Sequence, residues 1–369
     1  SKYITAGTVS LYLCVSSILR MLSGEDKLQK RKHKKDTEQM KKILLIATGG
    51  TIASKSTENG LVPTISSEEI IGFVPEVAEI ADIDTLSLFC IDSTNITHEH
   101  WIRIAAAIKE NYDLYDGFVI THGTDTMAYT SAALSYMIQS SPKPIVLTGS
   151  QKSIYLRDTD ARNNLIGAFM YAASDYAGGV SVVFDGKVII GTRAKKTRSK
   201  SFNAFSSIDF PELAHIRDRK IINYISERSD GQPVFYGKLD PEIFVYKLIP
   251  GADPWILDRL SGRYRAIVIE SFGVGGIPCY ANGDFIGALK RLIDSGVTVV
   301  MTTQVSHEGS DMEIYEVGMS AKESLDLMEA YDMTLEAITT KLMWILGQTS
   351  DPKKIKELFY TPISHDIIN

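Results

Sequence analysis

Short apolar runs rich in valine and isoleucine alternate with segments of helical period along most of the chain. The runs occur at 43–47, 117–121, 144–148, 180–184, 265–270 and 297–302. They predict buried strands, whereas apolar residues spaced three and four apart predict helices. The helical segments occur at 100–109, 125–139, 161–175 and 285–294. Because strands that alternate with helices favour parallel pairing, we expect an α/β fold.

Helix-start signals support the same pattern. Thr97 is placed to cap the helix at 100–109, and a strongly amphipathic helix is expected at 334–346. A last helix is predicted to begin with Asp351 as its N-cap. Pro352 then takes the first helical position, where the missing proline N–H leaves no helical hydrogen bond unmade.

The length of 369 residues exceeds what one hydrophobic core usually spans, which indicates two domains. A stretch at 229–254 is rich in Gly, Pro, Asp and Ser and is predicted to link them. We therefore expect a larger N-terminal α/β domain at 40–228, built on a mainly parallel sheet. A smaller C-terminal domain of the flavodoxin or Rossmann kind is expected at 255–369.

Residues 1–39 form an extension that is first apolar and then basic. The apolar run at 3–22 contains Arg20, and a basic stretch that includes 30–35 follows it. The run is about long enough to span a bilayer if Arg20 lies at the interface, and the basic flank would keep the main domain in the cytoplasm. A cleaved signal peptide fits poorly, because the positive charge follows the apolar run. The extension is either an anchor or a segment foreign to the native protein, and membrane contact is expected only in the first case.

Composition narrows the class of protein further. The 39 Lys and Arg against 45 Asp and Glu give a net charge of −6, which argues against a general nucleic-acid binder. Cys14, Cys90 and Cys279 are far apart and odd in number, so neither a disulfide framework nor a thiolate zinc site is indicated. A reducing compartment, the cytoplasm, is expected.

Two threonine-containing turns each follow a predicted strand. The first is Thr48-Gly49-Gly50-Thr51, and the second is Thr121-His122-Gly123-Thr124-Asp125-Thr126. Because strand carboxyl ends line the ligand crevice of an open α/β sheet, both turns could face one pocket. Each also has a purely structural interpretation. The first would be a Gly-rich tight turn, and the second would cap a helix through Asp125 or Thr126.

Other polar segments offer partners for these hydroxyls. A threonine is a poor nucleophile without a base, and Arg193-Ala194-Lys195-Lys196-Thr197-Arg198 offers lysines, whose pKa falls readily on burial. The segment follows a strand-like run at 187–190 and is otherwise interpreted as a solvated basic loop. Asp92-Ser93-Thr94-Asn95 either is only a turn and cap or reads a small polar substrate. His98 and His100 lack a third ligand with zinc spacing, so we interpret them as surface residues and expect no metal.

Together these motifs resemble the bacterial-type L-asparaginases, and more closely their cytoplasmic type I branch. The resemblance runs from about Met40 to the end of the chain. It rests on the two threonine turns, Asp92-Ser93-Thr94, Arg193 to Lys196 with Phe202-Asn203-Ala204-Phe205, and Ser271-Phe272-Gly273-Val274-Gly275. It implies hydrolysis of the side-chain amide of asparagine to aspartate and ammonia, without a metal or organic cofactor. It also implies a homodimer or homotetramer.

The resemblance implies roles for single residues as well. Thr51 matches the family's first catalytic threonine, usually assigned as the nucleophile, and Thr124 matches the second. With Lys196 and Asp125, Thr124 would form a hydroxyl–lysine–carboxylate group. Asp125 would also bind the α-ammonium of the substrate.

Ser93 and Thr94 match positions that hold the α-carboxylate and α-ammonium end of the substrate. Two other positions depart from the family's pattern. The resemblance implies that the segment at 53–63 is a mobile lid that closes on the substrate, and this segment contains no tyrosine. Leu61 stands where many relatives carry a tyrosine that hydrogen-bonds the nucleophile. Gly276 stands where relatives often have Asn, which weakens any assignment of substrate contacts from a neighbouring subunit.

Three alternative functions remain open at this point. They are a broader asparaginase–glutaminase, an amidase subunit acting on charged tRNA, and a catalytically silent sensor of a small amino acid. The acidic chain offers a tRNA no basic face outside 27–42. The missing lid tyrosine is the support for a sensor.

Overall fold

The computed structural model describes residues 40–57, 60–63, 66–278, 284–314, 318–319, 321–322, 325 and 327–368. Residues 42–369 form one compact unit. The proposed anchor at 3–22, Cys14 and Cys279 lie outside the described residues. Within the described ranges, no helix is both long and apolar enough to cross a bilayer.

An eight-stranded sheet forms the centre of the first domain. In spatial order its strands are β13 (Lys220–Asn223), β12 (Ala214–Arg217), β9 (Lys187–Ile190), β8 (Val180–Phe184), β7 (Ile145–Thr148), β5 (Gly117–Thr121), β1 (Lys42–Gly49) and β4 (Asp82–Ile91). Strands β4, β1, β5, β7 and β8 pair in parallel. Strands β9, β12 and β13 add an antiparallel edge. The mainly parallel sheet expected from the alternating pattern is therefore confirmed.

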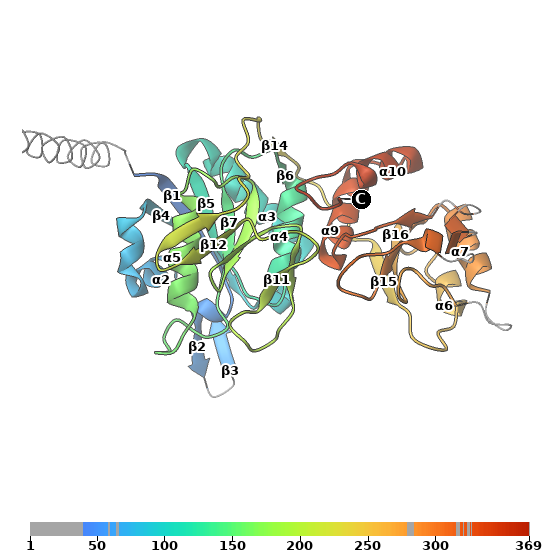
Figure 1. The fold of residues 1–369 in the computed structure, drawn as a ribbon, viewed down its shortest axis with the longest axis horizontal. Coiled ribbons are helices and arrows are strands. Elements are labelled where there is room, and N and C mark those ends of the chain that lie inside the picture. The colour runs from blue at the N-terminus through green and yellow to red at the C-terminus, as the bar shows by residue number, and fades with distance from the viewer. Residues whose placement is uncertain are drawn as a thin grey trace, which may run out of the picture. The chain divides into compact units, whose positions relative to one another are not determined.

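Helices cover both faces of this sheet (Figure 1). One face carries α2 (Ser67–Phe73) and α5 (Ala161–Ala172), and the other carries α3 (His98–Asn111) and α4 (Met127–Met137). Alternate residues of β1 enter the two cores: Ile43 and Leu45 pack toward α5, whereas Leu44 and Ile46 pack toward α3 and α4. A parallel strand buried on both sides needs apolar residues at every position, which explains the continuous apolar runs.

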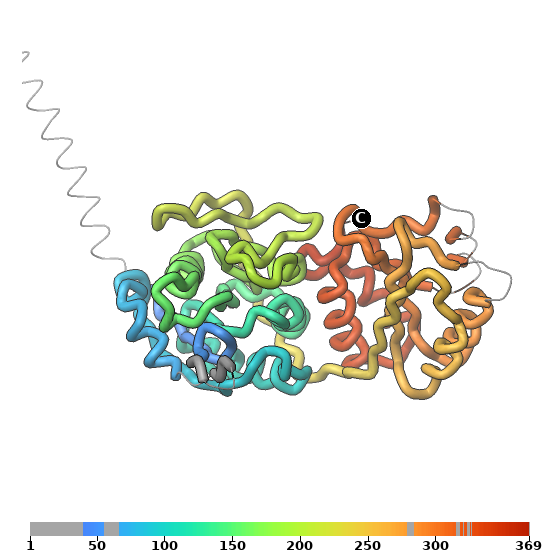
Figure 2. Tube along the Cα trace, turned by 90° about the horizontal axis from the view of Figure 1, so that it is seen from below, coloured from blue at the N-terminus to red at the C-terminus, as the bar shows by residue number. Residues whose placement is uncertain are grey.

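A smaller four-stranded parallel sheet organises the second domain. Its strands are β15 (Ile243–Lys247), β16 (Ala266–Ser271), β17 (Thr298–Thr303) and β18 (Met328–Glu329). Helices α6 (Trp255–Asp258) and α7 (Phe285–Asp294) cover one face, and α9 (Leu335–Gln348) and α10 (Pro352–Tyr360) cover the other. Strand β15 lies inside the stretch predicted as a linker. Figure 2 shows this yellow segment carrying the chain into the second domain.

The helix ends follow the local chemistry of the sequence. Helix α7 has the predicted bounds, and the Asp351 side chain accepts the Lys353 N–H at the start of α10, as expected of an N-cap. The Thr97 N–H is bonded to His100 Nδ1 at the start of α3, so this capping position is confirmed too. Helix α4, in contrast, begins at Met127, two residues later than predicted.

Several short ribbons stand outside the two large sheets. They are β2 (Ser54–Thr57) with β3 (Gly60–Pro63), β10 (Ala194–Lys196) with β11 (Phe205–Ser207), and β6 (Ile138–Gln139) with β14 (Val234–Phe235). Two three-residue 3₁₀ turns follow strands of the large sheet: Thr51–Ala53 follows β1, and Ser93–Asn95 follows β4.

Candidate active site

Three polar turns meet at the carboxyl ends of β4, β1 and β5. A Cβ atom built on Gly50 would lie 2.5 Å from Gly123 Cα, and one built on Gly123 would lie 2.5 Å from Ser93 Oγ. Such distances leave no room for a side chain at either glycine. The two glycines therefore let the backbones of the three turns touch, which brings the residues that follow them to one place.

Hydrogen bonds fasten the turns to one another. Thr48 Oγ1 donates to the Thr121 carbonyl at 2.8 Å, because β1 and β5 pair in register with Ala47 opposite Thr121. The Gly50 N–H donates to the Ile91 carbonyl at 3.1 Å. That amide hydrogen holds the turn, so it is not available to a developing oxyanion.

Thr124, Asp125 and Lys196 form one hydrogen-bonded group. Lys196 Nζ donates to Thr124 Oγ1 at 2.7 Å and to Asp125 Oδ1 at 2.7 Å. Thr124 is buried, and the Lys196 side chain keeps only 15% of its surface, whereas the Asp125 side chain keeps 57%. A hydroxyl and an ammonium are thus held away from bulk water, with a carboxylate at the opening.

The start of α4 explains why this group can form. Asp125 lies before the helix with its carboxylate on Lys196, and Thr126 Oγ1 donates to the Ser93 carbonyl at 2.8 Å. The sequence predicted a helix from residue 125, with Asp125 or Thr126 as its cap in the alternative interpretation. Thr126 is the N-cap residue, but its side chain bonds Ser93 and not the helix, so α4 starts at Met127.

Gln151 is a member of the site that the sequence analysis missed. Its Oε1 accepts from Thr124 Oγ1 at 3.1 Å, and its amide nitrogen donates to the Ser201 carbonyl at 3.1 Å. The buried carboxylate of Asp160, whose pKa is raised by burial, accepts the Gln151 N–H and fixes the turn. A signal was present: Gly149-Ser150-Gln151 follows the apolar run at 144–148 as the threonine turns follow theirs.

His122 lies under the second turn and is fully buried. Its Nδ1 is 2.7 Å from the Gly123 carbonyl oxygen, which only accepts, so we assign the proton to Nδ1. Its Nε2 then accepts from the Thr130 hydroxyl at 2.9 Å, and that oxygen accepts from Trp101 Nε1 at 2.9 Å. Burial lowers the pKa of His122 to about 4, so the ring is neutral near pH 7 and supports the turn.

Thr51 stands at the start of the first 3₁₀ turn, directly after Gly50. The φ angle of Gly50 is 85°, a conformation that favours glycine, and Ser54 Oγ donates back to the Gly50 carbonyl at 2.9 Å. Among the residues that the structure describes, the Thr51 hydroxyl has no hydrogen-bonding partner. The hairpin of β2 and β3 follows immediately, and the side chain of Leu61 lies outside the described residues.

The third turn presents Ser93 and Thr94 differently. Ser93 is buried against Gly123, whereas Thr94 is exposed and donates both its N–H and its hydroxyl to Asp92 Oδ1, at 2.9 and 3.0 Å. Their neighbour His100 uses Nδ1 to cap α3. The described part of the chain contains no group of three or more His, Cys, Asp or Glu side chains that could hold a metal ion.

Two protein-family models match the chain in order. "Asparaginase, N-terminal" matches residues 42–229, and "Glutaminase/Asparaginase C-terminal domain" matches residues 242–359. The chain belongs to the asparaginase family. The resemblance seen in the threonine turns is thereby confirmed, and with it the expectation of a hydrolase that acts on amide bonds.

Individual members of the family match at moderate identity. L-asparaginase from Thermococcus kodakarensis is 40% identical over 328 residues, which cover 88% of this chain and 99% of that protein. The solved structure of the thermostable L-asparaginase from that organism superposes with a TM-score of 0.82 at 39% identity, covering 89% of this chain and 99% of the other. L-asparaginase I from Vibrio cholerae superposes with a TM-score of 0.80 at 30% identity, covering 89% and 100%.

Other relatives of the chain are subunits of glutamyl-tRNA(Gln) amidotransferases. A glutamyl-tRNA(Gln) amidotransferase subunit from Metallosphaera sedula is 38% identical over 336 residues, which cover 87% of this chain and 75% of that protein. An amide hydrolase needs a nucleophile, a proton donor for the leaving amine and donors for the oxyanion. Threonine hydroxyls and a lysine ammonium, both present where the three turns meet, are chemical groups of that kind.

Proposed function

We propose that the protein hydrolyses the side-chain amide of L-asparagine to give aspartate and ammonia. The observation that carries the proposal is the Lys196 ammonium, which bonds Thr124 and Asp125 at once beside the Gly50–Gly123 contact. The L-asparaginase relative, of which the match covers 99%, supports asparagine as the substrate.

In the proposed mechanism Thr51 attacks the amide carbon. Its hydroxyl proton must leave, and the departing nitrogen must gain one, so one proton moves across the site. We assign this transfer to the Thr124 hydroxyl, which accepts a hydrogen bond from Lys196 Nζ and donates one to Gln151 Oε1. The C–N bond breaks, ammonia departs, and water then cleaves the Thr51 ester to release aspartate.

Substrate orientation is assigned to the polar rim of the site. The half-exposed Asp125 carboxylate would pair with the α-ammonium of asparagine, while it remains bonded to Lys196 through Oδ1. Ser93 and Thr94 would hold the α-carboxylate end. The proposed reaction requires no metal or organic cofactor, and we assign it to a cytoplasmic homodimer or homotetramer that binds no nucleic acid.

Two other activities fit the same family. The amidotransferase relatives support one of them, the release of ammonia for a tRNA-bound substrate. The other is hydrolysis of glutamine, whose side chain is one methylene longer than that of asparagine. A single methylene in a pocket is worth about 1–3 kcal/mol, so glutamine is expected to be a slower substrate that still reacts. A silent amino-acid sensor is the third possibility.

Ammonia release from asparagine and glutamine tests these assignments. The wild type should release ammonia from asparagine, and Thr51→Ala, Thr124→Ala and Lys196→Met should each lower kcat by about 10²-fold or more. Lys195→Met is the matched control, because Lys195 is adjacent to Lys196 on β10, whereas the hydrogen bonds to Thr124 and Asp125 come from Lys196. Binding of asparagine without release by the wild type would favour the sensor. Full activity in Thr124→Ala would refute the assigned roles.

A further inference from the structure

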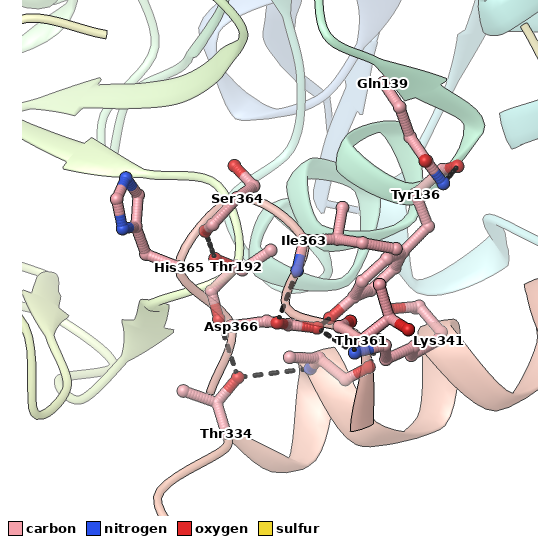
Figure 3. Close-up of polar contacts among 12 residues, drawn as sticks. Tyr136, Gln139, Thr192, Thr334, Lys341, Thr361, Ile363, Ser364, His365 and Asp366 are labelled. Carbon is pink, nitrogen blue, oxygen red and sulfur yellow. Dashed lines mark hydrogen bonds and ion pairs between the residues drawn. The ribbon is translucent and has the colours of Figure 1, made fainter. Parts of the chain in front are cut away.

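The segment 361–368, here called the strap, lies beside Thr192, which stands two residues before β10 (Figure 3). The Ser364 carbonyl accepts the Thr192 hydroxyl at 2.6 Å, and the His365 carbonyl accepts Arg193 Nε–H at 2.6 Å. Two successive carbonyls of the strap are thus bonded to two successive residues before β10.

A buried ion pair anchors the strap itself. Asp366 and Lys341 are both fully buried, and Lys341 Nζ lies 2.6 Å from Asp366 Oδ2. Tyr136 Oη donates to the same carboxylate at 2.9 Å, and the Ile363 N–H donates to its other oxygen at 2.9 Å. Lys341 also donates to the Thr361 carbonyl at 2.9 Å, so the strap is held at both ends (Figure 3).

Arg193 also bonds a second segment of the C-terminal domain, at Asp332. The side chain is fully buried, and its NH1 and NH2 groups donate to the carbonyl and the carboxylate of Asp332 at 2.7 and 2.8 Å. The other carboxylate oxygen of Asp332 accepts the Ile368 N–H at 3.2 Å. The sequence grouped Arg193 with a solvated basic loop, but a guanidinium held by three separate acceptors is a rigid joint.

Strand β10 needs such a joint because the large sheet does not hold it. In the described part of the chain β10 pairs with β11 alone, and a ribbon of two short strands is marginal by itself. Ala194 packs into the core, and Lys196, three residues after Arg193, carries the ammonium of the site. The position of that ammonium therefore depends on where Arg193 is fixed.

The strap also contacts α4, the helix that follows Thr124 and Asp125, the two bonding partners of Lys196. Tyr136, which donates to Asp366, lies on α4, and α4 follows Thr124 and Asp125 directly. Buried ion pairs can often be replaced by apolar residues without loss of stability. The Arg193 guanidinium and the Lys341 ammonium are both buried and both contact the strap. Their role is therefore to fix the position of the strap and not only to stabilise the fold.

We propose that the strap fixes β10 through Arg193, so that Arg193 is the positioning residue for Lys196. The inference rests on the proposed function of Lys196. A displacement of 1 Å in a reacting group lowers a rate by about 10²-fold. Loss of the Arg193 joint is therefore expected to lower kcat and to leave substrate binding nearly unchanged, because the joint touches none of the residues assigned to the substrate.

Arg193→Lys tests the proposal, since it keeps one charge and removes the fork. We expect kcat for asparagine to fall by about tenfold or more and KM to change by less than about threefold. Thr192→Val, which removes only the bond to the Ser364 carbonyl, should lower kcat by a smaller factor. It decides the question if Arg193→Lys does not fold.

Arg265→Lys is the matched control. Arg265 also forks between an aspartate and main-chain carbonyls, with Asp240, Leu346 and Thr349 as acceptors, but it lies away from β10. The control should lower the unfolding midpoint and leave kcat at the wild-type value. Equal kcat losses in the two arginine variants would overturn the proposal, because general loosening would then explain both.

A second readout does not depend on activity. Acetic anhydride labelling followed by mass spectrometry compares Lys196 with Lys187, a half-buried lysine on β9 that is paired with Glu212. Lys196 should label faster in Arg193→Lys and at the wild-type rate in Arg265→Lys. Unchanged labelling with unchanged kcat would refute the strap while asparagine hydrolysis stands. A wild type that releases no ammonia would refute the proposed function, and the labelling would still decide the strap.

Discussion

Gly50 and Gly123 touch at the point where β1 and β5 end. A side chain on Gly50 would lie within 2.5 Å of Gly123 Cα, and the φ angle of Gly50 is 85°. Both facts require glycine, one for space and one for backbone conformation. The contact is what brings the turn of Thr51 next to the turn of Thr124.

Gly50→Ala should therefore abolish the site rather than merely strain the chain. We expect ammonia release to fall by about 10²-fold or more, because the new methyl group must push the two turns apart. Gly251→Ala is the matched control: its φ angle is 81°, and an added Cβ would meet nothing within 4 Å. Comparable activity losses in both variants would show that backbone strain, and not the contact, is responsible.

Gln151 offers a test of how the Thr124 hydroxyl is oriented. Gln151→Met removes the acceptor of the Thr124 hydrogen bond at similar volume, and we expect kcat to fall by about tenfold or more. Gln151→Glu keeps an acceptor oxygen and should retain more activity than the methionine variant. Steady-state kinetics on asparagine give both values, and a methionine variant as active as the wild type would remove Gln151 from the site.

The sequence predicts the placement of the turns better than the contacts between them. Parallel strands end at the same edge of a sheet, so the strand pattern allowed the turns of Thr51 and Thr124 to face one crevice, with a tight turn and a helix cap as the alternatives. The pairing of Lys196 with Asp125 joins residues 71 positions apart, so the pattern of strands and helices does not predict it, and it was expected only from the resemblance to the asparaginases. Gln151 was missed because a glutamine side chain does not titrate and was therefore not expected among the groups that move protons. The late start of α4 was missed as well, because the side chain of its N-cap residue bonds a distant turn and not the helix.

Helix α10 provides a stability test away from the site. The Asp351 carboxylate accepts the Lys353 N–H at 3.1 Å, and the helix buries Ile355 and Phe359 against the second sheet. Asp351→Ala should lower the free energy of unfolding by about 1 kcal/mol, and Asp351→Asn by a few tenths at most. Urea unfolding of the three proteins measures this. An asparagine variant as unstable as the alanine variant would show that charge, and not capping, matters.

His122 predicts a pH dependence of stability whose sign follows from its burial. Its pKa is lowered to about 4 in the folded protein, whereas an exposed histidine titrates near 6.5. Between these values the unfolded chain binds a proton that the folded protein does not. The contribution of His122 to stability is therefore complete above pH 6.5 and is lost as the pH falls toward 4, by roughly 2–3 kcal/mol at pH 4.5.

The His122→Asn variant isolates this contribution. Its side-chain amide can still donate to the Gly123 carbonyl, as Nδ1 does, but it does not titrate. Urea unfolding at pH 7.5 and 4.5 should show the wild type losing roughly 2–3 kcal/mol more than the variant over that interval. Equal losses in the two proteins would mean that His122 is protonated in the folded state. The neutral hydrogen-bonded chain through Thr130 to Trp101 would then be wrong.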